Sequence, residues 1–218
     1  MKENSERLLK FRENRRMELI EAASKVLKKN GIHGLKVKDV ADRMNIGRGT
    51  LYEYIKTKND ILFIVMEDAL KRSIQELREK TNGISDPLLK LKKAIHVHLC
   101  IASKNPEILW ALYQESTPLS KTQFKKIFQY LNEYNGIFKK IIEEGGKEGI
   151  FDFIDSYLSA HSIATMLNTW LIKKNFLTYQ FSIEDYEKKI SGIILKGLLN
   201  LDEEHRTKNI ERLQSKEC

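Results

Sequence analysis

Apolar residues recur through this chain at the spacing of an α-helix. One example is a stripe at positions i, i+3, i+4, i+7 and i+8, formed by Leu19, Ala22, Ala23, Val26 and Leu27. No convincing alternation typical of strands occurs, and the three prolines of the 218 residues stand where helices could begin. The sequence therefore predicts an all-α fold, with three helices before residue 56 and six more after it.

Capping patterns set the expected limits of these helices. Gly31 is expected to end the first helix, and the pair Gly145-Gly146 is expected to end a long helix that opens at Ser120. Two further pairs resemble capping boxes, Thr57 with Asp60 and Ser182 with Asp185. We expect a first domain over residues 1–56, whose first 12 or so residues form a flexible arm. A second domain should cover residues 57–201, and residues 202–218 should form a frayed, charged tail.

The positive charge of the chain is concentrated near its beginning. Residues 1–60 hold 15 Lys and Arg against 9 Asp and Glu, a net charge of +6 out of +8 for the whole chain. A compact basic segment suggests a polyanionic partner such as nucleic acid. A solvated face with a few additional lysines would give the same charge, so this observation alone leaves both interpretations open.

Residues 37–56, VKDVADRMNIGRGTLYEYIK, have the pattern of a helix-turn-helix. Ala41 is small enough for two helices to approach each other, and Asn45, four positions later, tolerates the positive φ of a turn. Apolar residues that would hold the two helices follow at helical spacing, at Val37, Val40, Met44, Ile46, Leu51 and Tyr54. A structural hairpin without a DNA role would show the same pattern.

The run NGIHGLKVKDVADRMNIGRGTLYEYIKTKNDIL, residues 30–62, resembles the DNA-binding signature of the tetracycline-repressor (TetR) family. The resemblance covers about residues 14–64. It implies a three-helix helix-turn-helix domain followed by a six-helix ligand-binding and dimerisation domain. It also implies a ligand-responsive transcriptional regulator, a repressor, that binds a near-palindromic double-stranded DNA operator as a homodimer. A small apolar effector, such as an acyl-coenzyme A or a hydrophobic drug, would release the DNA.

The resemblance also assigns DNA-binding roles to individual residues. The recognition helix would present Arg48, Gly49, Thr50 and Tyr52 to the major groove, and Lys38, Tyr54 and Lys58 would contact phosphates. Three positions depart from the family pattern. Lys36 stands where the family often has Thr and could add a phosphate contact, and Gly47 stands where a Ser often caps the recognition helix. Ile55 replaces a usual Phe, which is a change in the core.

The larger domain is rich in aromatic residues, some of which are expected to line an effector cavity as in TetR-like proteins. Ordinary core packing is the alternative for each of them. The apolar candidates are Trp110, Phe128, Tyr134, Met166 and Trp170, and the polar residues that could orient a ligand are His98, Gln114, Asn168 and Tyr134 itself.

The last long helix, residues 183–201, is apolar nearly all round and so needs cover on two sides. The resemblance implies that it pairs, with the helix before it, against the same helices of a second copy. Burial within its own domain is the alternative. The residues expected at this interface are Ile163, Leu167, Ile190, Ile194 and Leu198.

Other kinds of chemistry find little support in the sequence. No nucleophile, acid–base or metal-ligand pattern is recognisable, so no catalytic residue, metal site or cofactor is expected and an enzyme is disfavoured. A helical nucleoid or architectural DNA-binding protein without a ligand is the main alternative. No apolar run is long enough for a membrane helix, and the charged N-terminus lacks a signal core. We therefore expect a cytoplasmic protein without a membrane partner.

Overall fold

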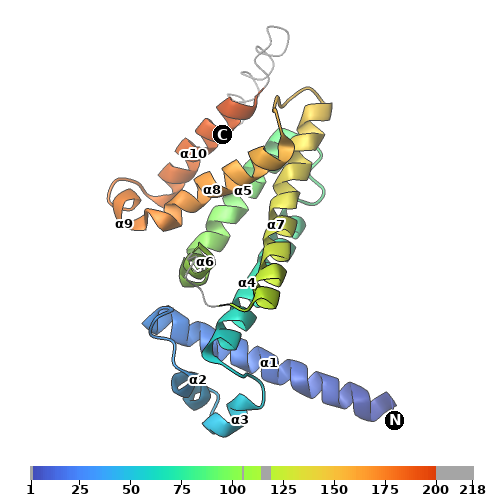
Figure 1. Cartoon of the computed structure of the whole chain (residues 1–218). Coiled ribbons are helices and arrows are strands. Elements are labelled where there is room, and N and C mark those ends of the chain that lie inside the picture. The colour runs from blue at the N-terminus through green and yellow to red at the C-terminus, as the bar shows by residue number, and fades with distance from the viewer. Residues whose placement is uncertain (1, 105, 114–118, 200–218) are drawn as a thin grey trace. The chain divides into compact units, whose positions relative to one another are not determined.

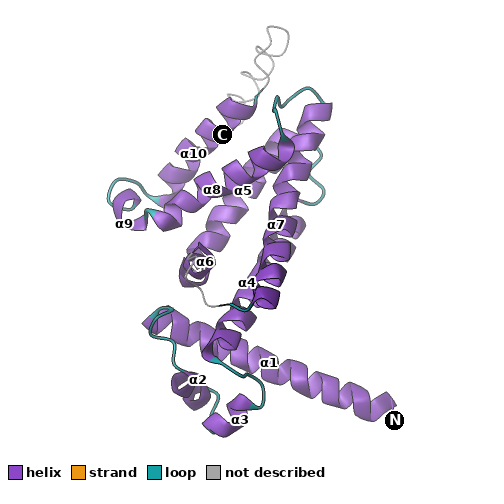
Figure 2. Ribbon diagram, viewed as in Figure 1, coloured by secondary structure: helices purple, strands orange, loops and turns teal. Residues whose placement is uncertain are grey.

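The computed structural model describes residues 2–104, 106–113 and 119–199, so Gln114 and the predicted tail lie outside the described residues. Helices joined by loops and turns make up the described part, which contains no strand, as the predicted all-α fold requires (Figure 2). An isolated antiparallel bridge joins Phe151 and Leu199. Its helices are α1 (Lys2–Asn30), α2 (Val37–Arg43), α3 (Arg48–Tyr52), α4 (Lys58–Thr81), α5 (Pro87–Lys104), α6 (Pro106–Tyr113), α7 (Lys121–Lys147), α8 (Ser156–Ile172), α9 (Lys174–Leu177) and α10 (Ile183–Leu198) (Figure 1).

Two of these elements differ from the sequence-based expectation. The four-residue helix α9 was not predicted, because a single turn has too few residues to show a period. Helix α1 begins at Lys2, so the segment expected to be a flexible arm continues the first helix instead.

The predicted capping pairs form where helices begin. Ser120 and Gln123 bond reciprocally at the start of α7: the Ser120 N–H donates to Gln123 Oε1 over 2.9 Å, and the Gln123 N–H donates to Ser120 Oγ over 3.3 Å. At α10 the Asp185 N–H donates to Ser182 Oγ over 3.1 Å. Each bond satisfies a backbone donor that a helix start leaves unpaired.

The end of α7 lies beyond the predicted glycine pair. Helix α7 continues to Lys147, and the residue with positive φ is Gly149, at +69°. Gly145 has a different role, because a Cβ there would lie 2.1 Å from the ring of Phe151. The glycine pair was therefore read wrongly as a helix end: Gly145 makes room for the ring that packs back onto the helix.

The chain divides into two compact units that do not follow the predicted boundary near residue 57. The head unit consists of Met1–Arg72 and Asn105–Tyr130, and the sensor unit of Ser73–Lys104 and Leu131–Cys218. Helices α4 and α7 each contribute residues to both units. The head unit is thus assembled from two segments that are far apart in the sequence.

Each unit has its own apolar core. In the head unit α1 contacts α2 and α6, and α2 contacts α3. In the sensor unit α5 contacts α8 and α10, which also contact each other. Helix α5 buries residues on most of its circumference because it is covered from more than one side. The fully buried residues of these cores include Ala23, Leu51 and Ile61 in the head and Leu91, Ile95 and Phe138 in the sensor unit.

Candidate nucleic-acid interface and effector site

The turn between α2 and α3 has the predicted helix-turn-helix geometry. Asn45 has a φ of +54°, the one positive value at a non-glycine residue within the described ranges. Ala41 is fully buried, and its carbonyl accepts the Ile46 N–H over 3.1 Å, which closes the turn. Short local bonds and a small buried residue therefore fix the angle between α2 and α3.

Helix α3 is buried on one side and exposed on the other. Leu51 is completely buried, whereas Tyr52 is 52% exposed. The other residues predicted to contact DNA are exposed as well, except Lys58, which is half-buried: Lys36, Lys38, Arg48, Gly49, Thr50 and Tyr54. An exposed helix face with a basic surround is the geometry that a major groove accepts.

Neither helix of this pair has a side-chain cap. Lys36 occupies the N-cap of α2 with extended φ and ψ of −121° and 136°, and it makes no capping hydrogen bond. Gly47 occupies the N-cap of α3, also without a side-chain bond. The helix starts therefore keep unpaired N–H groups, and at α2 the residue that could have capped is a cation instead.

The start of α4 is fixed by one carboxylate. Asp60 accepts the backbone N–H groups of Lys56 over 2.9 Å and Thr57 over 2.8 Å, and its other oxygen accepts Gln123 Nε2 over 2.7 Å. Burial would raise the pKa of Asp60, but these hydrogen bonds outweigh it, and the pKa lies below its usual value. Lys58, the predicted phosphate contact, is thus held at an ordered helix start.

In the sensor unit, three of the predicted effector residues form one buried polar chain. Tyr134 OH lies 3.0 Å from His98 Nδ1, and His98 Nε2 lies 3.0 Å from Asn168 Oδ1. Burial lowers the pKa of His98 to about 4, although the bond to Asn168 opposes the shift. The imidazole is therefore neutral near pH 7, accepting from Tyr134 on one side and donating to Asn168 on the other.

The remaining effector candidates lie elsewhere. Trp170 is buried against Tyr186, with ring centroids 5.1 Å apart, and Tyr186 OH donates to the Met166 carbonyl over 2.7 Å. Trp110 and Phe128 belong to the head unit, where their side chains are 39% and 49% exposed. The candidates that the structure describes are therefore divided between the head unit and the sensor unit.

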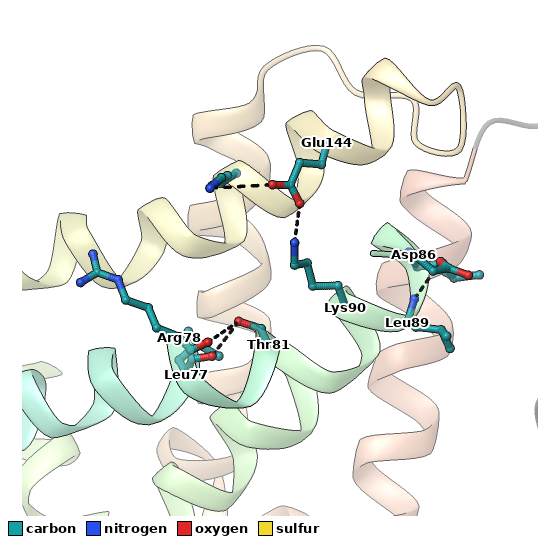
Figure 3. Close-up of polar contacts among 9 residues, drawn as sticks. Leu77, Arg78, Thr81, Asp86, Leu89, Lys90 and Glu144 are labelled. Carbon is teal, nitrogen blue, oxygen red and sulfur yellow. Dashed lines mark hydrogen bonds and ion pairs between the residues drawn. The ribbon is translucent and has the colours of Figure 1, made fainter. Parts of the chain in front are cut away.

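A groove of about 490 Å³ in the sensor unit lies between the end of α4, the start of α5 and the middle of α7. Two of its lining residues are paired, with Lys90 Nζ 2.7 Å from Glu144 Oε2, and Thr81 donates its hydroxyl to the Leu77 carbonyl over 2.7 Å (Figure 3). The effector candidates that the structure describes are absent from its lining, which consists of Arg78, Glu79, Thr81, Asn82, Lys90, Gly136, Ile137, Lys140, Ile141 and Glu144. Its walls combine charged and apolar groups, which suits an amphiphilic ligand.

Two family models match this chain. Residues 19–64 match the model described as "Bacterial regulatory proteins, tetR family", and residues 85–172 match "Tetracyclin repressor-like, C-terminal domain". Together the matches cover more than half of the sequence. The chain belongs to the TetR family. It is a DNA-binding transcriptional regulator rather than an enzyme, as the sequence predicted.

Individual relatives and solved structures match over most of their length. The "Fatty acid metabolism regulator protein" of Bacillus subtilis (strain 168) is 27% identical over 189 residues, which cover 84% of this chain and 95% of that protein. A crystal structure of FadR from Bacillus subtilis in complex with stearoyl-CoA aligns with a TM-score of 0.67 and 23% identity, covering 83% and 98% of the two chains. A regulator from Saccharomonospora viridis in complex with choline has a TM-score of 0.76 and 16% identity, covering 86% and 99%. The structural matches establish the TetR fold.

The residues expected at a TetR dimer interface face inward in this chain. Ile163, Leu167, Ile190, Ile194 and Leu198 are all at most 9% exposed within the single protomer. They pack in the sensor core, so a partner would meet other side chains of the same helices. The exposed large apolar residues of α8 and α10 are Tyr157, Leu158, Ile172 and Ile193.

A group of three side chains that the sequence did not predict links α5 to α10. Cys100 Sγ lies 3.5 Å from His96 Nε2, and His96 Nδ1 lies 3.0 Å from a carboxylate oxygen of Glu187. The i, i+4 spacing of His96 and Cys100 was the available signal; the third member, Glu187, lies 91 residues from His96 in the sequence.

No helix within the described ranges is long and apolar enough to cross a membrane.

Proposed function

We propose that this TetR-family regulator is a homodimeric repressor that binds a near-palindromic operator through α3 and the basic residues around it. The observation that supports this most directly is the contrast on α3 between buried Leu51 and exposed Arg48 and Thr50. In a helix-turn-helix the exposed positions of the second helix contact base edges, and the surrounding cations contact phosphates. Because DNA is the partner, we also propose that the protein acts in the cytoplasm.

A second copy of this chain is the proposed partner of the outward faces of α8 and α10. Ile193 is 60% exposed and Leu158 is 64% exposed, which is unusual for large apolar side chains on adjacent helices. A two-fold interface would cover both faces at once. It would also present two recognition helices, as a near-palindromic operator requires.

The proposed effector is an amphiphile with an apolar tail and an anionic head group, of which an acyl-coenzyme A is the leading example. Arg78, Lys90 and Lys140 line the groove and supply cations for an anionic head group, which would compete with the present partners, Glu133 for Arg78 and Glu144 for Lys90. Ile137 and Ile141 add apolar surface. The relatives named for fatty-acid metabolism and crystallised with stearoyl-CoA support this class; a hydrophobic cationic drug is the alternative.

Release of DNA would follow from movement of the helices that reach both units. Helix α4 begins at Lys58 and ends at Thr81, beside the groove residue Arg78, and its 24 residues span about 36 Å at 1.5 Å per residue. A small displacement at one end of such a rod changes the position of the other. Because linkage is reciprocal, the effector must weaken DNA binding by the factor by which DNA weakens effector binding.

The test begins with a DNA duplex selected by the wild-type protein from a random pool. Fluorescence anisotropy should show tight, salt-dependent binding to this duplex and much weaker binding to a scrambled one. Lys58→Ala should weaken binding to both and reduce the slope of log Kd against log salt by about one, whereas Thr50→Ala should mainly reduce discrimination. Equal affinity for the selected and scrambled duplexes would instead support an architectural protein.

The effector class is tested on the same complex. Stearoyl-coenzyme A should release the selected duplex, whereas free coenzyme A, which lacks the tail, should not. Release by a hydrophobic cation such as tetraphenylphosphonium, with no response to stearoyl-coenzyme A, would replace the acyl-coenzyme A proposal by the drug alternative. A promoter–reporter fusion carrying the selected site distinguishes repression from activation.

A further inference from the structure

Glu67 of α4 is a buried carboxylate at a point where three helices of the head unit meet. It is 1% exposed. Its Oε2 receives Arg16 Nη2 from α1 over 2.5 Å, and its Oε1 receives Lys126 Nζ from α7 over 2.6 Å. The Tyr130 hydroxyl of α7 donates to the same Oε1 over 3.1 Å. The two oxygens are thus divided between two helices, one toward α1 and the other toward α7.

The charge balance shows that this contact is ionic. Lys71 adds a third cation, 3.6 Å from Oε1. Burial would raise the pKa of Glu67, but the hydrogen bonds from Lys126 and Arg16 and the charges of Lys71 and Lys126 outweigh it and lower the pKa to about 2. The carboxylate is therefore charged throughout the physiological range. A buried charge needs its partners, since losing them leaves it uncompensated in a poorly solvated place.

The partners of Glu67 connect elements with different roles. Arg16 belongs to α1, which packs against α2 of the helix-turn-helix. Tyr130 and Lys126 belong to α7, and the same helix supplies Gly136 and Ile137 to the groove. Six residues separate Tyr130 from Gly136, about 9 Å along a helix axis. Fewer than two turns of one continuous helix therefore separate Tyr130 from Gly136, and fewer than three separate Lys126 from it.

We propose that Glu67 is a positioning residue for operator binding, which ties α7 to α1 so that a displacement of α7 at the groove alters the placement of the DNA-binding helices. This inference rests on the proposed ligand-controlled function and names the contact through which control would reach the DNA. Helices that meet through apolar side chains alone can slide past each other. The two oxygens of Glu67, each with its own donors, instead favour one relative position of α1 and α7. A shift of α7 draws Lys126 and Tyr130 from one oxygen while Arg16 retains the other.

The first experiment compares Glu67→Gln with Glu21→Gln. Glu21 is an exposed acid of α1 paired with Lys25, so its variant makes the same chemical change in the same unit away from α7. Affinity for the selected duplex is measured with and without saturating stearoyl-coenzyme A, and the ratio of the two Kd values is the coupling factor. We expect Glu67→Gln to reduce this factor roughly 2- to 30-fold, and Glu21→Gln to leave it unchanged. A merely structural role would lower both affinities together and leave the factor intact, which would overturn the proposal.

Two further arms keep the outcome decisive. If Glu67→Gln fails to fold by circular dichroism, Lys126→Met replaces it, because the Lys126 side chain is 49% exposed and its loss should not unfold the protein. If the wild type does not respond to stearoyl-coenzyme A, the proposed effector class has failed, whereas the proposed link of α7 to α1 through Glu67 is still open to test. This link is then tested without effector, by a double-mutant cycle of Arg16→Met and Lys126→Met on duplex affinity. If the fold-loss of duplex affinity in the double variant is smaller than the product of the two single losses, the link is supported, because both substitutions act on the Glu67 carboxylate. If the two losses simply multiply, the link is overturned.

Discussion

Nε2 of His98 lies 3.0 Å from Oδ1 of Asn168, and 70 residues of sequence separate the two. This contact makes the histidine a donor toward α8, so that its other nitrogen can accept from Tyr134 only while the ring is neutral. Protonation would require the Tyr134 hydroxyl to turn and accept instead, and it would place a positive charge in a buried site. The sensor core therefore contains a group whose charging opposes folding.

A pH dependence follows from this arrangement. The pKa of His98 is about 4 in the folded protein and about 6.5 when unfolded. Between these values the unfolded chain binds the additional proton, so the free energy of unfolding falls as the pH falls, by about 3 kcal/mol at pH 4. Urea denaturation from pH 7 to pH 4 should show this loss, and His98→Gln should be less sensitive over the same window. Identical pH profiles for the two proteins would contradict the assignment.

Lys36→Ser should separate stability from DNA binding. The N-cap dihedral angles of Lys36 suit a serine, whose hydroxyl could accept a backbone N–H of α2, so the free energy of unfolding should rise by about 1 kcal/mol. Removal of the cation should at the same time weaken binding to the selected duplex and reduce the salt slope. Lys38→Ser is the control, since it removes a charge inside α2 without creating a cap. Equal thermal stabilities of Lys36→Ser and Lys38→Ser would argue against the proposal that α2 lacks a stabilising N-cap.

Adjacent residues of α10 should respond differently to the same substitution. Ile193 is 60% exposed and Ile194 is 2% exposed. Ile193→Asp should give a folded monomer, because the charge disrupts a surface that the partner covers. Ile194→Asp should lower the free energy of unfolding of the sensor unit by several kcal/mol, because it buries an unpaired charge. Sedimentation velocity and thermal denaturation read the two effects, and a wild type that sediments as a monomer at micromolar concentration would refute the interface.

Gly136 offers a way to fill the groove. A Cβ at this position would have no heavy atom within 4 Å, other than its chain neighbours and its own helix backbone. Gly136→Leu should therefore place its side chain in the groove and weaken stearoyl-coenzyme A binding by roughly tenfold or more, while affinity for the selected duplex stays near wild type. Gly136→Ala is the control for the gain in helix propensity, about 0.5–1 kcal/mol. Undiminished effector binding by Gly136→Leu, measured by calorimetry, would place the effector elsewhere.

The accuracy of the sequence-based prediction follows the range of the interactions involved. The turn at Asn45 and the caps at Ser120 and Ser182 are local, so a few neighbouring residues sufficed to predict them. The role of Gly145 could not be read in the same way, because it depends on where Phe151 returns to the helix. Local rules assign a glycine pair to a helix end, and tertiary packing overrode that rule here.

In the candidate sites, too, local features were predicted and features set by tertiary packing were not. The exposed residues of α3 were identified because the helix-turn-helix is a short contiguous motif. Helical periodicity identified α10 as apolar on two sides but could not tell which side faces its own core, so the inward residues were assigned to the partner. Glu67 went unnoticed because its partners Arg16 and Lys126 lie 51 and 59 residues away, and neither spacing leaves a pattern in the sequence.

The composition of the head unit from Met1–Arg72 and Asn105–Tyr130 bears on how such regulators can be recombined. A chimera joined at residue 57 would carry the DNA-binding helices but leave behind Glu67, α6 and the first turns of α7. The grafted head would then lack α6, which contacts α1, and the carboxylate that Arg16 requires. Exchange of DNA specificity is therefore better attempted by replacing the exposed residues of α3 one at a time than by transplanting the segment that encodes the motif.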